Sequence, residues 1–98
     1  MKPTLEVLIE ARRLIETGQN DYVCHAVLKA CMNLRVAIQD AVEMQSFLMK
    51  QLDGRGTLDS FIAHTYHEPF IWWATPEEKN LQCLMRLAWL DKMISEAS

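Results

Sequence analysis

The chain has 98 residues, half of them hydrophobic and 23% charged, and it contains only three glycines and three prolines. This composition excludes a disordered or collagen-like chain and is typical of one small globular domain, here residues 1–98. Thirteen acidic against ten basic residues give a net charge of −3, which argues against a nucleic-acid-binding protein with a basic face. A domain of this size buries only about 60–65% of its unfolded surface, so homo-oligomerisation is compatible with it.

Neither a targeting signal nor a membrane segment is expected. Charges at Glu6 and Glu10 interrupt the N-terminal segment, where a signal peptide needs a continuous apolar stretch. The longest unbroken apolar run, residues 70–74, has five residues, against the ~20 that cross a bilayer. The three cysteines are an odd number without the spacing of a disulfide framework. We therefore expect reduced thiols and a cytoplasmic protein.

The first half of the chain predicts two or three helices. Thr4 as N-cap and Gly18 as a residue able to adopt positive φ bound a first amphipathic helix. Within residues 22–52, apolar residues recur at alternating spacings of four and three, interrupted only by Gln45. Two interpretations stay open for this segment: one helix of about 30 residues, or two helices with a break near Asn33, which average helix length favours.

The second half predicts two more helices. After a turn at residues 53–56, Thr57 can cap a short helix that ends before Pro69. Thr75-Pro76-Glu77-Glu78 has the pattern of a capping box with proline at the first helical position, and it starts the last helix. Its inward stripe is expected at Cys83, Leu87, Leu90 and Ile94. The fold class is therefore all-α, a compact bundle of four to five helices without a sheet.

No pattern for catalysis is found. His64 and His67 share a helix face and would suit a zinc ion, but their order matches no metalloprotease motif, and a solvated helix end is the competing interpretation. Cys24 and Cys31 lie two helical turns apart, about 10 Å, which favours two buried thiols over one metal site. The chain has no phosphate-binding loop and no nucleophile motif. We expect a protein that is not an enzyme and holds no metal or cofactor.

An aromatic cluster is the main candidate for a partner-binding surface. On the last helix Trp89 lies about 160° around the axis from Leu87, on the same outward side as Met85. Trp and Met outside a core are typical of binding surfaces. The predicted set has apolar anchors and a polar rim, and it comprises Trp72, Trp73, Met85, Arg86, Trp89 and Lys92. The competing interpretation is that residues 70–74 fold over the helix and bury Trp89 in a small second core.

Arginines suggest an alternative function. Asp91 lies close to the inward stripe of the last helix, where it would pair with Arg12, Arg13 or Arg35 or else reach solvent. Guanidinium groups bind phosphate in a bidentate way. A pocket between subunits, with phosphate contacts from Arg12, Arg13, Arg35 and Arg55, would make the protein an oligomeric sink for a nucleotide-type signal.

Several stretches resemble a loose group of small helical proteins encoded by bacteriophages and prophages. They are Ala11-Arg12, Leu14-Ile15 and Gly18, then Val23-Cys24 and Ala26, and finally Arg86-Leu87-Ala88-Trp89-Leu90-Asp91-Lys92. The resemblance covers about a third of the chain and brings no catalytic residues with it. It implies an accessory protein in a bacterial cytoplasm that binds and inhibits or modulates a host protein, components of antiviral defence included. A non-enzymatic inhibitor of this kind is the leading expectation.

Overall fold

The computed structural model describes residues 1–51, 58–66 and 75–98, apart from the side chains of Ser60, Phe61 and His64. These residues contain no strand, which confirms the all-α class. They form five helices: α1 (Leu5–Glu16), α2 (Val23–Asn33), α3 (Ile38–Lys50), α4 (Leu58–Thr65) and α5 (Pro76–Ala97).

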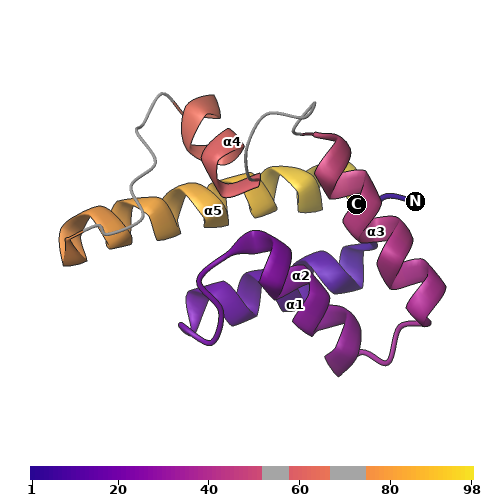
Figure 1. Ribbon diagram of the computed structural model, residues 1–98. Helices are drawn as coiled ribbons and strands as arrows, with labels where there is room; N and C mark the ends of the chain where they lie inside the picture. The colour runs from indigo at the N-terminus through magenta and orange to yellow at the C-terminus, as the bar shows by residue number, and fades with distance from the viewer. Residues whose placement is uncertain (52–57, 67–74) are drawn as a thin grey trace.

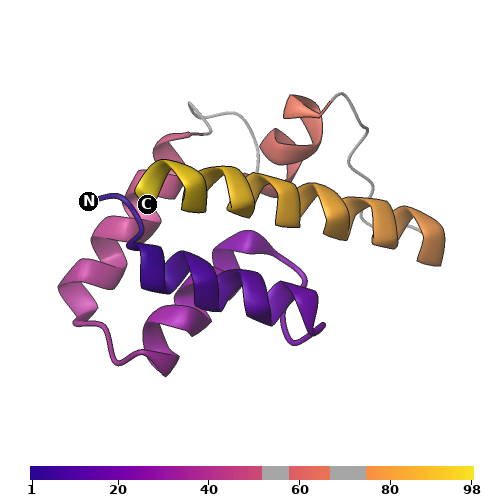
Figure 2. The same cartoon turned by 180° about the vertical axis from the view of Figure 1, so that it is seen from behind.

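The longest helix, α5, crosses the molecule as a rod against which other helices pack (Figure 1). α1 packs against both α2 and α5. α4 packs against α5 and also contacts α2. Seen from behind, α1 runs beside α5 (Figure 2). α3 stands at one end of the molecule, near both chain termini. α5 therefore has neighbours on two sides, whereas α3 packs mainly against α2.

The ends of α1 follow the sequence expectation. The Thr4 hydroxyl accepts a hydrogen bond from the Val7 amide at 3.3 Å, and Gly18 adopts φ +77° after the last turn. The amides of Gly18 and Gln19 donate back to Ile15 and Leu14 at 3.1 and 2.9 Å. These two bonds make a Schellman motif, in which glycine is favoured because it has no Cβ to strain the left-handed backbone.

Residues 22–52 form two helices, and the break has a cause that the sequence did not indicate. Arg35 has φ +55°, and the amides of Arg35 and Val36 donate to Met32 and Cys31 at 3.2 and 2.9 Å. The turn that ends α2 is thus the same Schellman motif, with arginine where α1 has glycine. Asn33 does not cap α3; it is the last residue of α2, and Ala37 precedes α3 without a side-chain hydrogen bond.

The core is concentrated in α1 and α2, while α3 contributes only its second half. Buried apolar side chains occur along the full length of α1 and α2, and α4 adds Leu58, Ile62 and Ala63. The fully buried residues of α3 are Met44 and Leu48. Because the chain turns at Arg35, the apolar pattern of residues 22–52 does not make one continuous buried seam. Leu34 and Ile38 belong to that pattern but are exposed.

α5 begins as predicted but is oriented differently. The Thr75 hydroxyl and the Glu78 carboxylate each accept the other's backbone amide, at 3.2 and 3.3 Å, which confirms the capping box. The expected outward position of Met85 and Trp89 is wrong, since both are buried and Trp89 is 5% exposed. The physical reason is that α4 packs on α5 in addition to α1, so that α5 buries two faces instead of one stripe.

Replacing Arg35 by glycine is expected to stabilise the protein. Arg35→Gly removes the Cβ from a left-handed residue and should raise the free energy of unfolding by roughly 0.5–1 kcal/mol. Urea denaturation measures the change. Arg35→Ala is the matched control, because it removes the charge and keeps the Cβ, and it should bring no such gain. Equal effects of the two substitutions would show that the backbone at residue 35 is not strained.

Candidate functional site

A buried ion pair joins three helices. The Arg86 Nε donates to the Asp59 Oδ1 at 2.6 Å, and their side chains are only 9% and 6% exposed. Arg86 Nη2 also donates to Gln82 Oε1 at 3.4 Å, while the Val23 amide donates to the same Asp59 oxygen at 3.4 Å. The expected role of Arg86 at a solvent-facing rim is therefore wrong, because Asp59 holds it inside the molecule.

Asp59 also completes the start of α2. Tyr22, the N-cap residue, supplies no side-chain hydrogen bond to the first turn. The Asp59 carboxylate takes that place from α4, and a negative charge is favourable at a helix N-terminus. The Tyr22 ring lies 5.1 Å from the Arg86 guanidinium carbon and meets His25 edge-on, with ring centroids 5.6 Å apart. The charges of Asp59 and Arg86 are thus paired inside the protein, as expected for a cluster that stabilises the fold.

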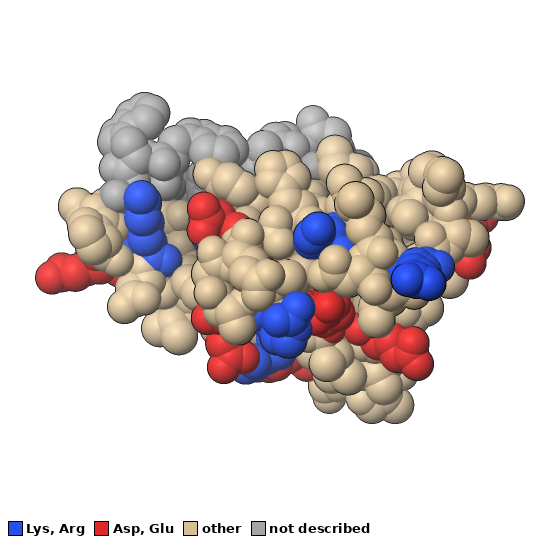
Figure 3. Space-filling view, turned by 90° about the horizontal axis from the view of Figure 1, so that it is seen from below, with Lys and Arg blue, Asp and Glu red and all other residues tan. Residues whose placement is uncertain are grey.

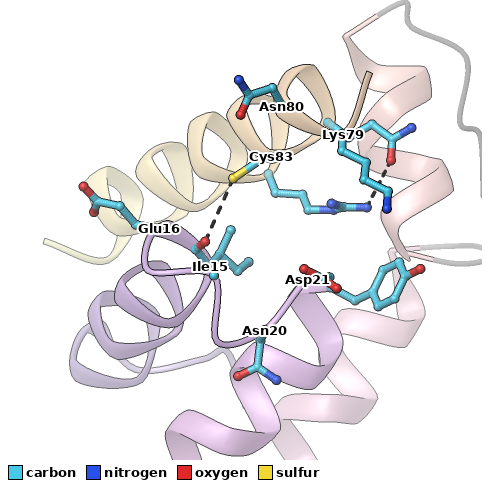
Figure 4. Close-up of a pocket in the computed structure, with 11 residues that line it drawn as sticks. Ile15, Glu16, Asn20, Asp21, Lys79, Asn80 and Cys83 are labelled. Carbon is cyan, nitrogen blue, oxygen red and sulfur yellow. Dashed lines mark hydrogen bonds between the residues drawn. The ribbon is translucent and has the colours of Figure 1, made fainter. Parts of the chain in front are cut away.

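A polar pocket of about 410 Å³ opens beside this cluster, between α5 and the α1–α2 connection (Figure 4). Lys79 and Arg86 contribute positive charge, and Glu16 and Asp21 contribute the same amount of negative charge. The guanidinium at the pocket wall donates to Asp59 and Gln82. A pocket with balanced charges does not favour a strongly anionic ligand such as a nucleotide phosphate.

The arginines of the alternative function are mostly engaged elsewhere. Arg12 donates to Asp91 at 2.6 Å and to Glu16 at 2.6 Å. Of the partners that the sequence left open for Asp91, the structure selects Arg12, and the Asp91 side chain also stays half exposed to solvent. The hydrogen bond to Asp91 raises the pKa of Arg12 above its ordinary value. Arg13 pairs with Glu10, and this hydrogen bond lowers the pKa of the Glu10 carboxyl. Arg12, Arg13 and Arg35 do not line this polar pocket, and Arg55 lies outside the described residues.

The cysteines are free thiols. Burial raises the pKa of the Cys31 thiol, and burial together with the charge of Asp59 raises that of Cys24, so both are protonated at neutral pH. The part of the chain that the structure describes has no group of three or more side chains placed to hold a metal. The proposed zinc pair lies outside it, since the His64 side chain and His67 are not described.

An apolar groove of about 320 Å³ lies between α2 and α3. Its walls consist mostly of aliphatic and sulfur-containing side chains, with two polar residues, Gln45 and Ser46. The apolar members are Leu28, Cys31, Met32, Val36, Ile38, Ala41 and Val42. Ile38 is 83% exposed and Val42 57%, although both are large and apolar. Gln45, the polar interruption of the sequence pattern, donates to the Cys24 carbonyl at 3.2 Å and so bridges the two helices. We call this surface the α2–α3 groove.

Three exposed charged residues lie next to groove residues in the sequence but do not line the α2–α3 groove. Lys29 follows Leu28 on α2, Glu43 follows Val42 on α3, and Arg35 lies in the connection between the helices. All three are exposed, and within the described residues none of them forms an ion pair. The face on which α1 and α2 lie likewise mixes basic and acidic side chains over a largely uncharged surface (Figure 3).

The structure does not expose the predicted binding surface as one patch, because three of its six residues are buried. Of its six candidates, Met85, Arg86 and Trp89 are buried, Lys92 is exposed, and Trp72 and Trp73 lie outside the described residues. The groove was missed because Ile38 belongs to a helical apolar pattern that is normally core. Nothing in the local sequence indicated that Arg35 would turn the chain and leave Ile38 exposed.

Comparison with models of protein families, with curated proteins and with solved structures found no match for this chain. Among the described residues, no helix has both the length and the apolar character needed to cross a membrane.

Breaking the buried ion pair is expected to destabilise the protein strongly. Asp59→Leu or Arg86→Met alone leaves an uncompensated buried charge and should cost about 3–5 kcal/mol, whereas the double variant should lose far less. A double-mutant cycle in urea measures the coupling between the two residues. Arg12→Met is the control for the exposed Arg12–Asp91 pair and should cost under about 1 kcal/mol. Additive losses from Asp59 and Arg86 would contradict the pairing.

Trp89 is expected to act through stability. Trp89→Ala should lower the free energy of unfolding by about 3–5 kcal/mol, because it leaves a cavity in the core. Leu84, on the same helix, is 61% exposed, and Leu84→Ala should change stability by under about 0.5 kcal/mol. Thermal unfolding of both variants provides the measurement. If the Trp89→Ala protein were as stable as the wild type, Trp89 would not be part of the core.

Proposed function

We propose that the protein is a non-enzymatic interaction protein that binds another protein through the α2–α3 groove. The observation that carries this proposal is the exposure of large apolar side chains on both walls of one groove, with Ile38 at 83% and Val42 at 57%. Contiguous exposed apolar surface is uncommon on monomeric soluble proteins and marks binding sites.

The packing of α3 supports the same proposal. Its fully buried residues are Met44, in the middle of the helix, and Leu48, in the last turn, and the first turns have none. Helices of this length are marginal on their own, and most of their stability comes from packing of an apolar face. A partner that covers Ile38 and Val42 would supply that packing to the first half of α3.

The groove suits an amphipathic helix of the partner. Two helices that diverge from a short connection make an apolar hollow, and apolar side chains spaced by three and four residues on a helix fit such hollows. Met32 contributes an unbranched, adaptable side chain to the wall.

The resemblance to phage-encoded proteins suggests what kind of partner the protein binds. Within it, the partner is a protein of the bacterial host, and binding inhibits or modulates that protein by covering part of its surface. The oligomeric phosphate sink finds no comparable support, because Arg12 and Arg13 are already paired with carboxylates.

A groove substitution is expected to remove the partner without unfolding the protein. Val42→Asp places a charge in the apolar groove and should reduce capture of the bound host protein from a bacterial lysate at least about tenfold, equivalent to 1.4 kcal/mol. Leu84→Asp, at a similarly exposed position on α5, is the matched control and should capture the partner as the wild type does. Quantitative mass spectrometry of the captured proteins provides the measurement.

Circular dichroism must show equal helicity for the wild type and both variants. A host protein that Val42→Asp retains and Leu84→Asp loses would move the binding surface from the groove to α5. Capture that neither substitution alters would reject the α2–α3 groove as the site.

A further inference from the structure

We infer that the polar pocket between α5 and the α1–α2 connection binds a small zwitterion, an α-amino acid or a dipeptide. The carboxylate of this ligand lies against α5, and its ammonium group lies against the connection. The pocket is separate from the α2–α3 groove, since none of the described residues lines both. Its ligand is therefore independent of the partner protein proposed above.

The pocket has the size and the lining of a site for a small polar molecule. Its volume of about 410 Å³ lies near the lower end of the range of about 300–1,000 Å³ in which proteins bind small ligands. One wall is a face of α5, and the other is the end of α1 with the connection that leads to α2 (Figure 4). Apart from Ile15, Gly18 and Cys83, the residues that line it have polar side chains.

The charges that line the pocket are separated by sign. Lys79 and Arg86 belong to α5 and lie about two helical turns apart, on the same face. Glu16 and Asp21 belong to the opposite wall, and Figure 4 shows Lys79 on α5 and Asp21 on the connection. The pocket thus has no net charge but has a positive wall and a negative wall. A ligand with one charge of each sign fits this field better than an anion or a cation does.

On each wall one charge is already paired and the other is available. The Arg86 guanidinium is held by the carboxylate of α4, and Glu16 is paired with Arg12, each at 2.6 Å. Lys79 and Asp21 are exposed, and within the described residues neither forms an ion pair. Because these two side chains do not pair with each other either, they can bind the opposite ends of one ligand.

Arg86 adds a hydrogen-bond donor of fixed orientation to the positive wall. Its side chain is 9% exposed, and it donates to Asp59 at 2.6 Å and to Gln82 at 3.4 Å. These two bonds use only part of the N–H donors of a guanidinium, which leaves others for the ligand carboxylate. Since Asp59 balances the charge of Arg86, Lys79 supplies the net attraction and Arg86 supplies direction.

Thermal unfolding of the purified full chain tests this assignment. The probes are the common α-amino acids, one at a time, and the dipeptide dialanine, all at millimolar concentration. At least one probe should raise the melting temperature by at least about 3 °C, and more as its concentration increases. The N-acetyl form and the amide form of that probe each lack one of its charges, so each should bind at least about tenfold more weakly.

Two substitutions remove the available charges one at a time. Lys79→Gln and Asp21→Asn should each weaken binding of the best probe at least about tenfold. Both side chains are exposed and unpaired within the described residues, so without the probe both variants should unfold at the temperature of the wild type. Lys92→Gln is the matched control, because it removes an exposed lysine of the same helix outside the pocket, and it should bind the probe as the wild type does.

Cys83 reports where the ligand lies. Its half-buried thiol lines the pocket, whereas Cys24, also half-buried, does not. The bound probe should slow alkylation of Cys83 by iodoacetamide and leave that of Cys24 unchanged, as measured by mass spectrometry of the modified peptides.

The same experiments can overturn the inference in two ways. A melting temperature that no probe raises, or equal binding of the acetylated and amide forms, would show that the pocket does not recognise two separated charges. Binding that Lys79→Gln and Asp21→Asn leave intact, or equal slowing of alkylation at Cys83 and Cys24, would place the ligand outside this pocket.

Discussion

The buried pair of Asp59 and Arg86 is the constraint on which the arrangement of α2, α4 and α5 depends. One carboxylate oxygen receives the Arg86 Nε at 2.6 Å and the first amide of α2 at 3.4 Å. Two charges that have left water are stable only when they stay paired and hydrogen-bonded, so the positions of α4 on α5 and of α2 beside them are linked. A short helix of eight residues, α4, is thereby fixed to the longest helix of the protein.

The packed and unpacked ends of the molecule divide its roles. At one end α1, α2, α4 and α5 are held together by apolar packing and ion pairs. The polar pocket, whose charges balance, lies between α5 and the α1–α2 connection. At the other end α3 uses half of its length for the core and presents the rest to solvent. A rigid scaffold that displays a partly supported apolar helix is the arrangement expected of a binding protein whose partner completes the packing.

The helix ends at Thr4, Gly18 and Thr75 were predicted correctly from the sequence. The burial that depends on packing between helices was not. The caps at Thr4, Gly18 and Thr75 depend on neighbouring residues only, and each has the predicted form. The Arg12–Asp91 pair was one of several alternatives that the sequence left open for Asp91, and packing of α1 on α5 decides among them. The burial of Arg86 depends on where α4 places Asp59, which no periodicity within α5 records. The exposure of Ile38 depends on a turn that an arginine makes in the conformation of a glycine.

That turn has a dynamic consequence. The same hydrogen-bonded motif ends α1 with Gly18 and α2 with Arg35, so the second copy stores backbone strain that the first lacks. The α2–α3 connection is followed by the half of α3 without fully buried residues. Segments with low burial open locally more easily than the core, so amide hydrogens of residues 35–42 are expected to exchange with solvent before those of the buried middle of α1 and α5. A molecule bound over this segment would slow that exchange.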